Sequence, residues 1–295
     1  MSLRIQGIAF SALAWLMLVA SLWLPRLDAP TQLALLSPVI LLLGFPHGAL
    51  DMVFARQLMP VQSVATWALF ATAYLAAAAS VVVLWFLAPS FFLAAFLLVS
   101  AFHFSGDPEG ETPAWFRMLY GGAIIFCPLT LHAAEVLEIF ALLAGEQAAQ
   151  TIVAALQPIA WPWLAAIIVA AITTAKHGLA RSVELVSVAA LLSFLPPLIG
   201  FAVFFCAMHG ARHVLRTRDY AHVGTLRHLL RIAAAPMFVT VAGVAIAWWL
   251  SDGQPLDMRL AQLLFVGLAA LTVPHMIVVE RVRLSGWMLG RSIAN

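Results

Sequence analysis

Long apolar runs separated by short polar segments are the feature that most constrains the fold of this chain. A membrane-spanning helix needs about 20 mainly apolar residues, whereas a membrane β-strand needs about 10 that alternate in polarity. The runs of helix length lie at 5–24, 31–50, 64–88, 90–105, 115–143, 150–175, 182–195, 198–215, 232–250 and 259–281. The pattern predicts an all-α, polytopic membrane protein with about ten transmembrane helices.

The composition agrees with a chain that is solvated by lipid. Of its 295 residues, 64% are hydrophobic and 9% are charged, whereas soluble domains are about 45–50% apolar and about 25% charged. These values exclude a soluble enzyme and a disordered chain, and a net charge of +2 is too small to indicate a nucleic-acid partner. No long loop or repeat divides the chain, so residues 1–295 are expected to form a single integral membrane domain.

The distribution of basic residues predicts the orientation of the chain. With a cytoplasmic N-terminus, all of the 15 Lys and Arg residues except Arg26 and Arg259 fall in cytoplasmic segments. Both termini are therefore expected in the cytoplasm and the chain in the cell inner (plasma) membrane. The pair Pro196-Pro197 would reduce the helices to nine if it merely kinked one long helix, but the basic residues would then be split between both sides.

Histidines are the unusual polar residues of the apolar runs. Two of the nine histidines, His222 and His228, lie in an Arg-rich loop and are expected at the surface, and His177 is expected at the interface. Ionisable residues inside membrane spans are costly, so the others are functional candidates. The histidines expected at one depth, near the cytoplasmic ends of four helices, are His47, His103, His209, His213 and His275. His132 is expected nearer the outer side.

The spacing of His209 and His213 suits a metal ion. Residues at i and i+4 share one face of a helix, so both imidazoles can reach one ion. An isolated H-x-x-x-H pair is equally typical of core histidines that hydrogen bond to backbone carbonyls. The shared depth of His47 and His103 nevertheless favours a set of metal ligands. Neutral imidazole binds Fe, Cu and Zn. An all-histidine set in apolar surroundings favours a redox iron that handles O₂ and an apolar substrate.

Two aspartates are expected beside these ligands. Asp51 is four residues after His47, where its carboxylate could accept the second ring N–H of that histidine. A helix cap or a partner for Arg56 is an equally good interpretation of Asp51. Asp107 follows His103 closely enough to contact a ligand, although a solvated loop is the simpler interpretation of the segment.

Four short motifs resemble one family. The string Gly-Phe-Pro-His-Gly-Ala-Leu-Asp at 44–51 resembles the G-x-P-H-G-A-x-D motif of the Brp/Blh family, the membrane-bound β-carotene 15,15′-dioxygenases that make retinal for microbial rhodopsins. The blocks around His103, His209 to His213 and His275 agree in order and spacing, so the resemblance covers essentially the whole chain. The chain departs from the family where Ser105 precedes Gly106, since the family often has Gly directly after His-Phe.

The resemblance implies a catalytic membrane domain that uses Fe(2+). A non-haem iron dioxygenase of this family would cleave the central 15,15′ double bond of β-carotene with O₂ to give two all-trans-retinal molecules, with a functional link to a microbial rhodopsin. The iron ligands that the resemblance implies are His47, His103, His209 and His213. The residues expected to surround them, as hydrogen-bond partners or substrate contacts, are Asp51, Asp107 and His275.

Other interpretations use the same histidines differently. A membrane di-iron desaturase or hydroxylase needs more H-x-x-x-H boxes than the single one at 209–213. A haem-binding electron carrier would pair histidines as axial ligands, and such pairs usually lie at two depths. A transporter would use the histidines as proton relays.

Overall fold

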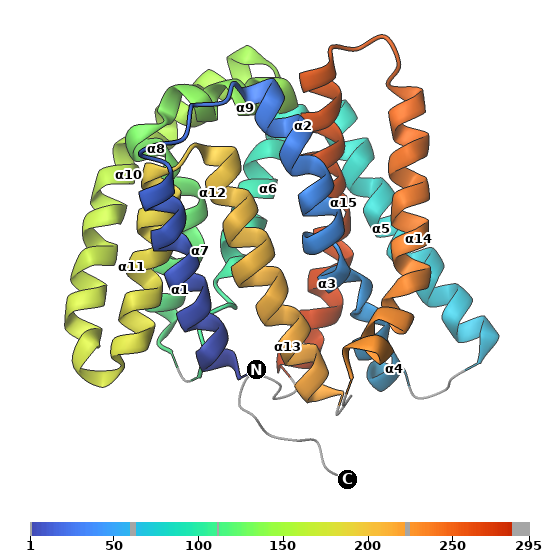
Figure 1. Cartoon of the computed structure of the whole chain (residues 1–295). Helices are drawn as coiled ribbons and strands as arrows, with labels where there is room; N and C mark the ends of the chain where they lie inside the picture. The colour runs from blue at the N-terminus through green and yellow to red at the C-terminus, as the bar shows by residue number, and fades with distance from the viewer. Residues whose placement is uncertain (1, 60–62, 111, 222–224, 285–295) are drawn as a thin grey trace.

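The computed structural model describes residues 2–59, 63–110, 112–221 and 225–284, and within these ranges the chain is all helical (Figure 1). The helices, with π-helical and 3-10 segments marked η, are α1 Leu3–Ala20, α2 Ala29–Val39, η1 Ile40–Gly44, α3 Pro46–Ala49, α4 Asp51–Leu58, α5 Val64–Leu87, α6 Pro89–Phe104, α7 Ala114–Phe126, α8 Pro128–Leu131, α9 Ala133–Ala144, α10 Glu146–Thr174, η2 Ala175–His177, α11 Leu179–Phe194, α12 Pro197–Val203, η3 Phe204–Gly210, α13 Ala211–Tyr220, α14 Leu226–Leu250 and α15 Leu256–Leu284. The predicted all-α fold is confirmed.

The long helices are suited to a membrane. Within the described ranges, six helices are long and apolar enough to cross a bilayer, and three shorter apolar helices accompany them at Ala29–Gly44, Pro89–Phe104 and Ala114–Phe126. Many large apolar side chains point outwards; Val64 on α5, for example, is 88% exposed. An outward apolar surface of this kind is what a lipid-solvated bundle requires.

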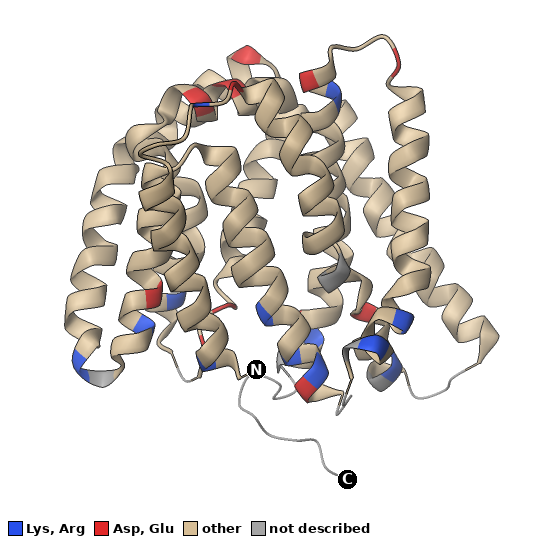
Figure 2. Ribbon diagram, viewed as in Figure 1, with Lys and Arg blue, Asp and Glu red and all other residues tan. Residues whose placement is uncertain are grey.

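The two ends of the bundle differ in their charged residues. Figure 2 shows most Lys and Arg residues at the end where α1 begins and α15 reaches its last described turns. Acidic residues occur at both ends (Figure 2). The basic end is therefore the end that is expected in the cytoplasm from the distribution of basic residues along the sequence.

Helix starts follow from capping residues. The side chains of Ser2, Asp28 and Ser63 accept hydrogen bonds from the backbone of α1, α2 and α5 respectively. Each cap satisfies one of the N–H groups that the first turn of a helix leaves without a partner. At Asp28, outside the candidate spans, hydrogen bonds from the side chain and backbone of Thr31 lower the pKa of the carboxyl.

Prolines explain where the helices depart from the predicted runs. The run 115–143 was expected to be one span, but it is divided into α7, α8 and α9, so that expectation is wrong. Pro128 begins α8, and His132 leaves helical geometry (φ −125°, ψ 32°) before α9 begins. The pair Pro196-Pro197 separates α11 from α12, which run in opposite directions (Figure 1).

Two π-helical segments bring distant parts of the chain together. The segments η1 and η3 contact each other, and a Cβ atom added to Gly44 would collide with the ring of Phe205. Glycine at this position therefore allows the Phe205 ring of η3 to pack against η1. The π-helical turns are often found at functional sites, and here they precede α3 and α13, which carry His47 and His213.

Arg212 links three helices and a turn inside the bundle. Its side chain is 1% exposed, and its Nη1 and Nη2 donate to Glu184 Oε1 and Oε2 at 2.8 and 2.7 Å. Its Nε donates to Gln6 Oε1 at 2.9 Å, and Nη1 also donates to the carbonyl of Asp107 at 3.0 Å. This polar network joins α1, α11 and α13 to the turn after α6.

Replacement of Glu184 by Ala should destabilise the bundle. The substitution leaves the Arg212 guanidinium buried without its carboxylate, which costs about 3–5 kcal/mol in comparable ion pairs. The thermal unfolding midpoint of the purified protein in detergent should fall clearly for Glu184→Ala. The control Glu138→Ala, at an exposed residue of α9, should unfold as the wild type does, and equal midpoints for both variants would contradict the role of the ion pair.

Candidate metal centre

Four histidines from four segments meet near the basic end of the bundle. They are His103 in the last turn of α6, His209 in η3, His213 in α13 and His275 in α15. The ring centroids of His103 and His209 are 4.6 Å apart, and that of His275 lies 5.2 Å from His103 and 5.0 Å from His213. These four residues are called the histidine cluster below.

Three histidines of the cluster are shielded from solvent, and His103 is half-buried. His209, His213 and His275 are 3%, 6% and 2% exposed. The rings of Phe104 and Phe205 pack against His209 with centroids 4.8 and 5.8 Å away. Buried imidazoles need polar partners to offset the loss of hydration, so their hydrogen bonds decide what the cluster can do.

Asp107 fixes the proton of His209. The Nδ1 atom of His209 lies 3.0 and 3.1 Å from the two carboxylate oxygens of Asp107. A carboxylate accepts hydrogen bonds, so Nδ1 carries the hydrogen and Nε2 of the neutral ring presents its lone pair. That Nε2 atom points to His103, whose own Nε2 is 3.0 Å away.

Asp51 acts on His275 in the same way. The Nδ1 atom of His275 donates to Asp51 Oδ1 at 2.6 Å, while the hydroxyl of Tyr74 donates to Asp51 Oδ2 at 2.8 Å. The second nitrogen of His275 therefore also presents a lone pair. Carboxylates that hold the far nitrogen of an imidazole are the usual partners of metal-binding histidines.

Two arginines hold the turn that carries Asp107. Arg212 Nη1 and Arg216 Nη2 both donate to the Asp107 carbonyl, at 3.0 and 2.7 Å, and Arg216 Nη1 donates to the Gly106 carbonyl at 2.9 Å. The carboxylate of Asp107 is thus directed at His209 by the same network that joins the helices.

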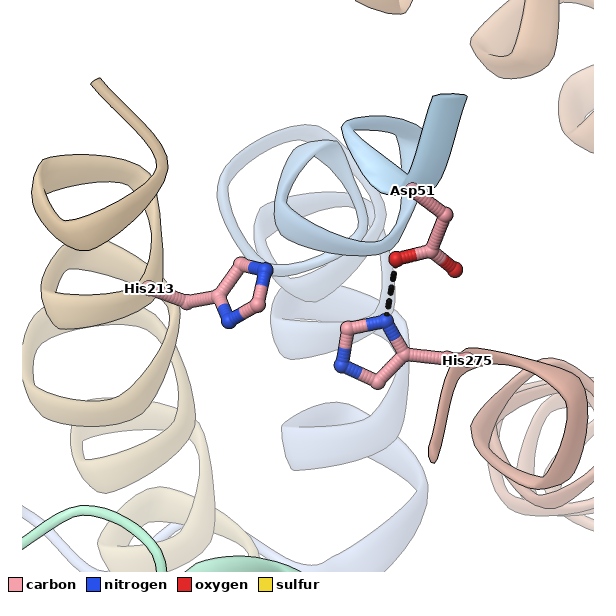
Figure 3. A group of neighbouring side chains, drawn as sticks. All are labelled: Asp51, His213 and His275. Carbon is pink, nitrogen blue, oxygen red and sulfur yellow. Dashed lines mark hydrogen bonds and ion pairs between the residues drawn. The ribbon is translucent and has the colours of Figure 1, made fainter. Parts of the chain in front are cut away.

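The donor atoms fit a divalent metal ion. Asp51, His213 and His275 each offer one donor atom within 4.8 Å of the others, and Figure 3 shows the His213 ring turned towards the Asp51–His275 pair. Imidazole nitrogens bind such ions at about 2.1 Å, and two of these bonds at a right angle place the nitrogens about 3.0 Å apart. The Nε2 atoms of His103 and His209 have this separation. Without an ion, the same distance allows a hydrogen bond from His103 to His209.

The structure brings most of the sequence-predicted residues together. His275, which was expected beside the ligands, lies within the histidine cluster. Asp51 hydrogen bonds to His275, a partner that the sequence did not predict. The backbone of His47 lies in α3, which packs against α13 and α15; its side chain lies outside the described part of the structure, so its ligand role stays a prediction.

His132 does not join the cluster. Its Nδ1 lies 2.8 Å from Glu135 Oε1 and its Nε2 lies 3.4 Å from the carbonyl of Phe194, at the break before α9. Sequence reasoning missed Tyr74 and Arg216, because nothing in the local sequence distinguishes them. The extra cost of an Arg inside a predicted span could have drawn attention to Arg212.

The comparisons of this chain with known proteins agree with one another. The family model described as beta-carotene 15,15′-dioxygenase matches residues 39–283. The curated beta-carotene 15,15′-dioxygenase of the uncultured marine bacterium 66A03 is 27% identical over 260 residues, which cover 82% of this chain and 90% of the relative. No solved structure matches the chain. The matched range covers most of the chain and includes the histidine cluster with both of its aspartates. The chain therefore belongs to the β-carotene 15,15′-dioxygenase family.

Proposed function

We propose that this protein is a non-haem iron dioxygenase that cleaves the central 15,15′ double bond of β-carotene with O₂ and releases two all-trans-retinal molecules. Family membership supports the reaction. The observation that carries the proposal is the histidine cluster, in which Asp107 and Asp51 each hold one imidazole with its lone pair turned inwards.

The metal in this proposal is ferrous iron, held by His47, His103, His209 and His213. The short separation of the His103 and His209 nitrogens supports this set, as does the proximity of His213. His275 lies close enough to supply a further nitrogen. Neutral imidazoles add no charge of their own, which suits an apolar substrate.

Bound iron would supply the one-electron chemistry that allows O₂ to react with a carbon–carbon double bond. The reaction balances without an added reductant, because one C=C bond and one O₂ become two C=O bonds. Asp107 and Asp51 keep hydrogens on the Nδ1 atoms of His209 and His275, so the lone pairs of the Nε2 atoms stay available to a metal ion. Phe104 and Phe205 keep water away from His209.

The bundle crosses the cell inner membrane about ten times, with both termini in the cytoplasm. The gathering of basic residues at the end where α1 begins supports this orientation (Figure 2). β-Carotene then enters from the lipid bilayer, and a microbial rhodopsin is the expected user of the retinal.

Two alternatives use the same residues without carotene cleavage. Axial histidines on opposite faces of a haem lie about 4 Å apart, since each bond is about 2 Å, so the 3.0 Å between His103 and His209 does not favour a haem-binding electron carrier. A proton-relaying transporter needs no bound iron. Iron without haem absorbance in the purified protein would count against both.

Bacteria that accumulate β-carotene should lose their colour and form retinal when they express this protein. Ala at any proposed ligand should abolish both effects, because the iron loses a donor. The variants to test are His47→Ala, His103→Ala, His209→Ala and His213→Ala. His228→Ala, at an exposed residue of α14, should behave as the wild type. Full activity of His209→Ala and His213→Ala would overturn the proposed site.

Asp107→Asn should weaken iron binding without removing a ligand. Loss of a hydrogen-bond partner of a metal-bound histidine typically lowers metal affinity or activity about 10–100-fold. Titration of iron into the metal-free protein measures the effect directly. Asp252→Asn, whose carboxylate is 84% exposed, is the matched control, and equal affinities in the two variants would contradict the role given to Asp107.

Reporter fusions test the orientation. Alkaline phosphatase joined after Asp252 should be active in the periplasm, and a fluorescent protein joined after Gly178 should fold in the cytoplasm. The reverse result at either position would contradict the proposed topology.

A further inference from the structure

Tyr74 connects a lipid-facing helix to the histidine cluster. Of the six candidate spans, α5 is the least buried, and Val81 is the only buried residue in this fully described helix. Tyr74 lies near the middle of α5, and its side chain is half-buried. Its hydroxyl donates to Asp51 Oδ2 at 2.8 Å, and Asp51 begins α4. The hydrogen bond therefore joins α5 to a residue that already contacts the cluster.

The carboxylate of Asp51 is held at both of its oxygens. Oδ1 accepts the hydrogen of His275 Nδ1 at 2.6 Å, and Oδ2 accepts that of the Tyr74 hydroxyl. The Asp51 side chain is 4% exposed, and a buried carboxylate needs such donors in place of water. Because the two donors come from different helices, the carboxylate cannot turn about its Cβ–Cγ bond without losing a hydrogen bond. The direction of Oδ1 towards His275 therefore depends on Tyr74.

Neighbouring aromatic side chains hold Tyr74 in place. Its ring packs on that of Phe70, with centroids 5.8 Å apart, and Phe70 packs on Trp67 at 5.9 Å. The three residues lie on one face of α5, since their spacing is i, i+3 and i+7. The guanidinium of Arg56 lies over the Trp67 ring at 5.9 Å. This face of α5 thus contacts the first residue of α4, Asp51, and its last turn, which contains Arg56.

The separations of the His275 ring from its neighbours suit a shared metal ion. Its centroid lies 5.2 Å from that of His103 and 5.0 Å from that of His213. An imidazole bound to an ion places its centroid about 3.2 Å from that ion, so two such centroids are about 4.5 Å apart at a right angle and about 5.2 Å apart at the tetrahedral angle. Since Nδ1 donates to Asp51, the lone pair of the neutral His275 ring is on Nε2.

We infer that Tyr74 is a positioning residue of the metal centre. Through Asp51 it holds His275 in the orientation in which Nε2 of that ring faces the ion. The inference rests on the proposed function, because it requires an ion within the histidine cluster. Asp107, the carboxylate beside His209, is held differently, since two arginines bind its backbone carbonyl. The position of α5 against α4 and α15 is thus linked to the direction of one histidine.

Tyr74→Phe tests this role, because it removes one hydroxyl and keeps the aromatic ring. The probe is Co²⁺, a divalent ion that stands in for Fe²⁺ and whose visible absorption changes with its ligands. Titrated into the metal-free protein in detergent, Co²⁺ should bind Tyr74→Phe about 10-fold more weakly, the lower end of the range for a lost hydrogen-bond partner of a metal-binding histidine. Its absorption spectrum should also change.

Tyr220→Phe is the matched control, since it removes the same group from a tyrosine at the end of α13 whose ring packs on Phe54 at 5.3 Å. Its Co²⁺ affinity should stay within about twofold of the wild type. Equal affinities in the two variants overturn the inference. So does a Tyr74→Phe protein whose thermal unfolding midpoint falls while Co²⁺ affinity and spectrum stay unchanged, because the hydroxyl is then merely structural.

A second background tests whether Tyr74 acts through His275. Asn at position 275 can still donate to Asp51 but offers no imidazole nitrogen. Adding Tyr74→Phe to His275→Asn should change Co²⁺ affinity by less than about twofold, because the group that Tyr74 positions is already lost. A further loss as large as in the wild-type background overturns the inference. If His275→Asn abolishes Co²⁺ binding, His275 is itself a ligand, and the comparison of Tyr74→Phe with Tyr220→Phe decides.

These measurements do not depend on carotene cleavage, so the two proposals can fail separately. Co²⁺ binding that requires the Tyr74 hydroxyl, in a protein that cleaves no carotene, supports the inference and refutes the dioxygenase. Cleavage of β-carotene by a protein whose Co²⁺ affinity is the same in both tyrosine variants refutes the inference and leaves the dioxygenase in place.

Discussion

The buried guanidinium of Arg212 is the interaction on which the site depends. It binds Glu184 through two hydrogen bonds and also holds Gln6 and the carbonyl of Asp107. A buried charge is tolerated only when its partners are in place, so packing of α1 and α11 against α13 and placement of Asp107 occur together. His209, which is next to Asp107, receives its orientation from the same contacts. The contacts that pack these helices therefore also determine the geometry of the histidines.

The sequence predicts this fold well because lipid leaves few alternatives. Backbone polar groups must be satisfied within each span, so the run 64–88 becomes Val64–Leu87 and 90–105 becomes Pro89–Phe104. The expectation for 115–143 was wrong because hydrophobicity alone does not locate a break, and Pro128 interrupts the helix within an apolar run.

The sequence also predicts part of the site. Depth in the membrane follows from helix limits, which is why His103, His209, His213 and His275 could be placed together. The partner of each histidine depends on helix packing, and no local signal predicts it. Asp51 is four residues from His47, yet it hydrogen bonds to His275, 224 positions away.

The histidine cluster lies at a boundary between polar and apolar surroundings. Along α6, residues such as Leu97 and Ser100 line an apolar cavity, while the turn after Phe104 carries Asp107 and receives the hydrogen bonds of Arg212 and Arg216. The carboxylates therefore fix ring hydrogens from a polar segment that is separate from this apolar lining. Because one helix and its following turn carry both, a shift of α6 would alter the orientation of the histidines and the shape of the apolar cavity together.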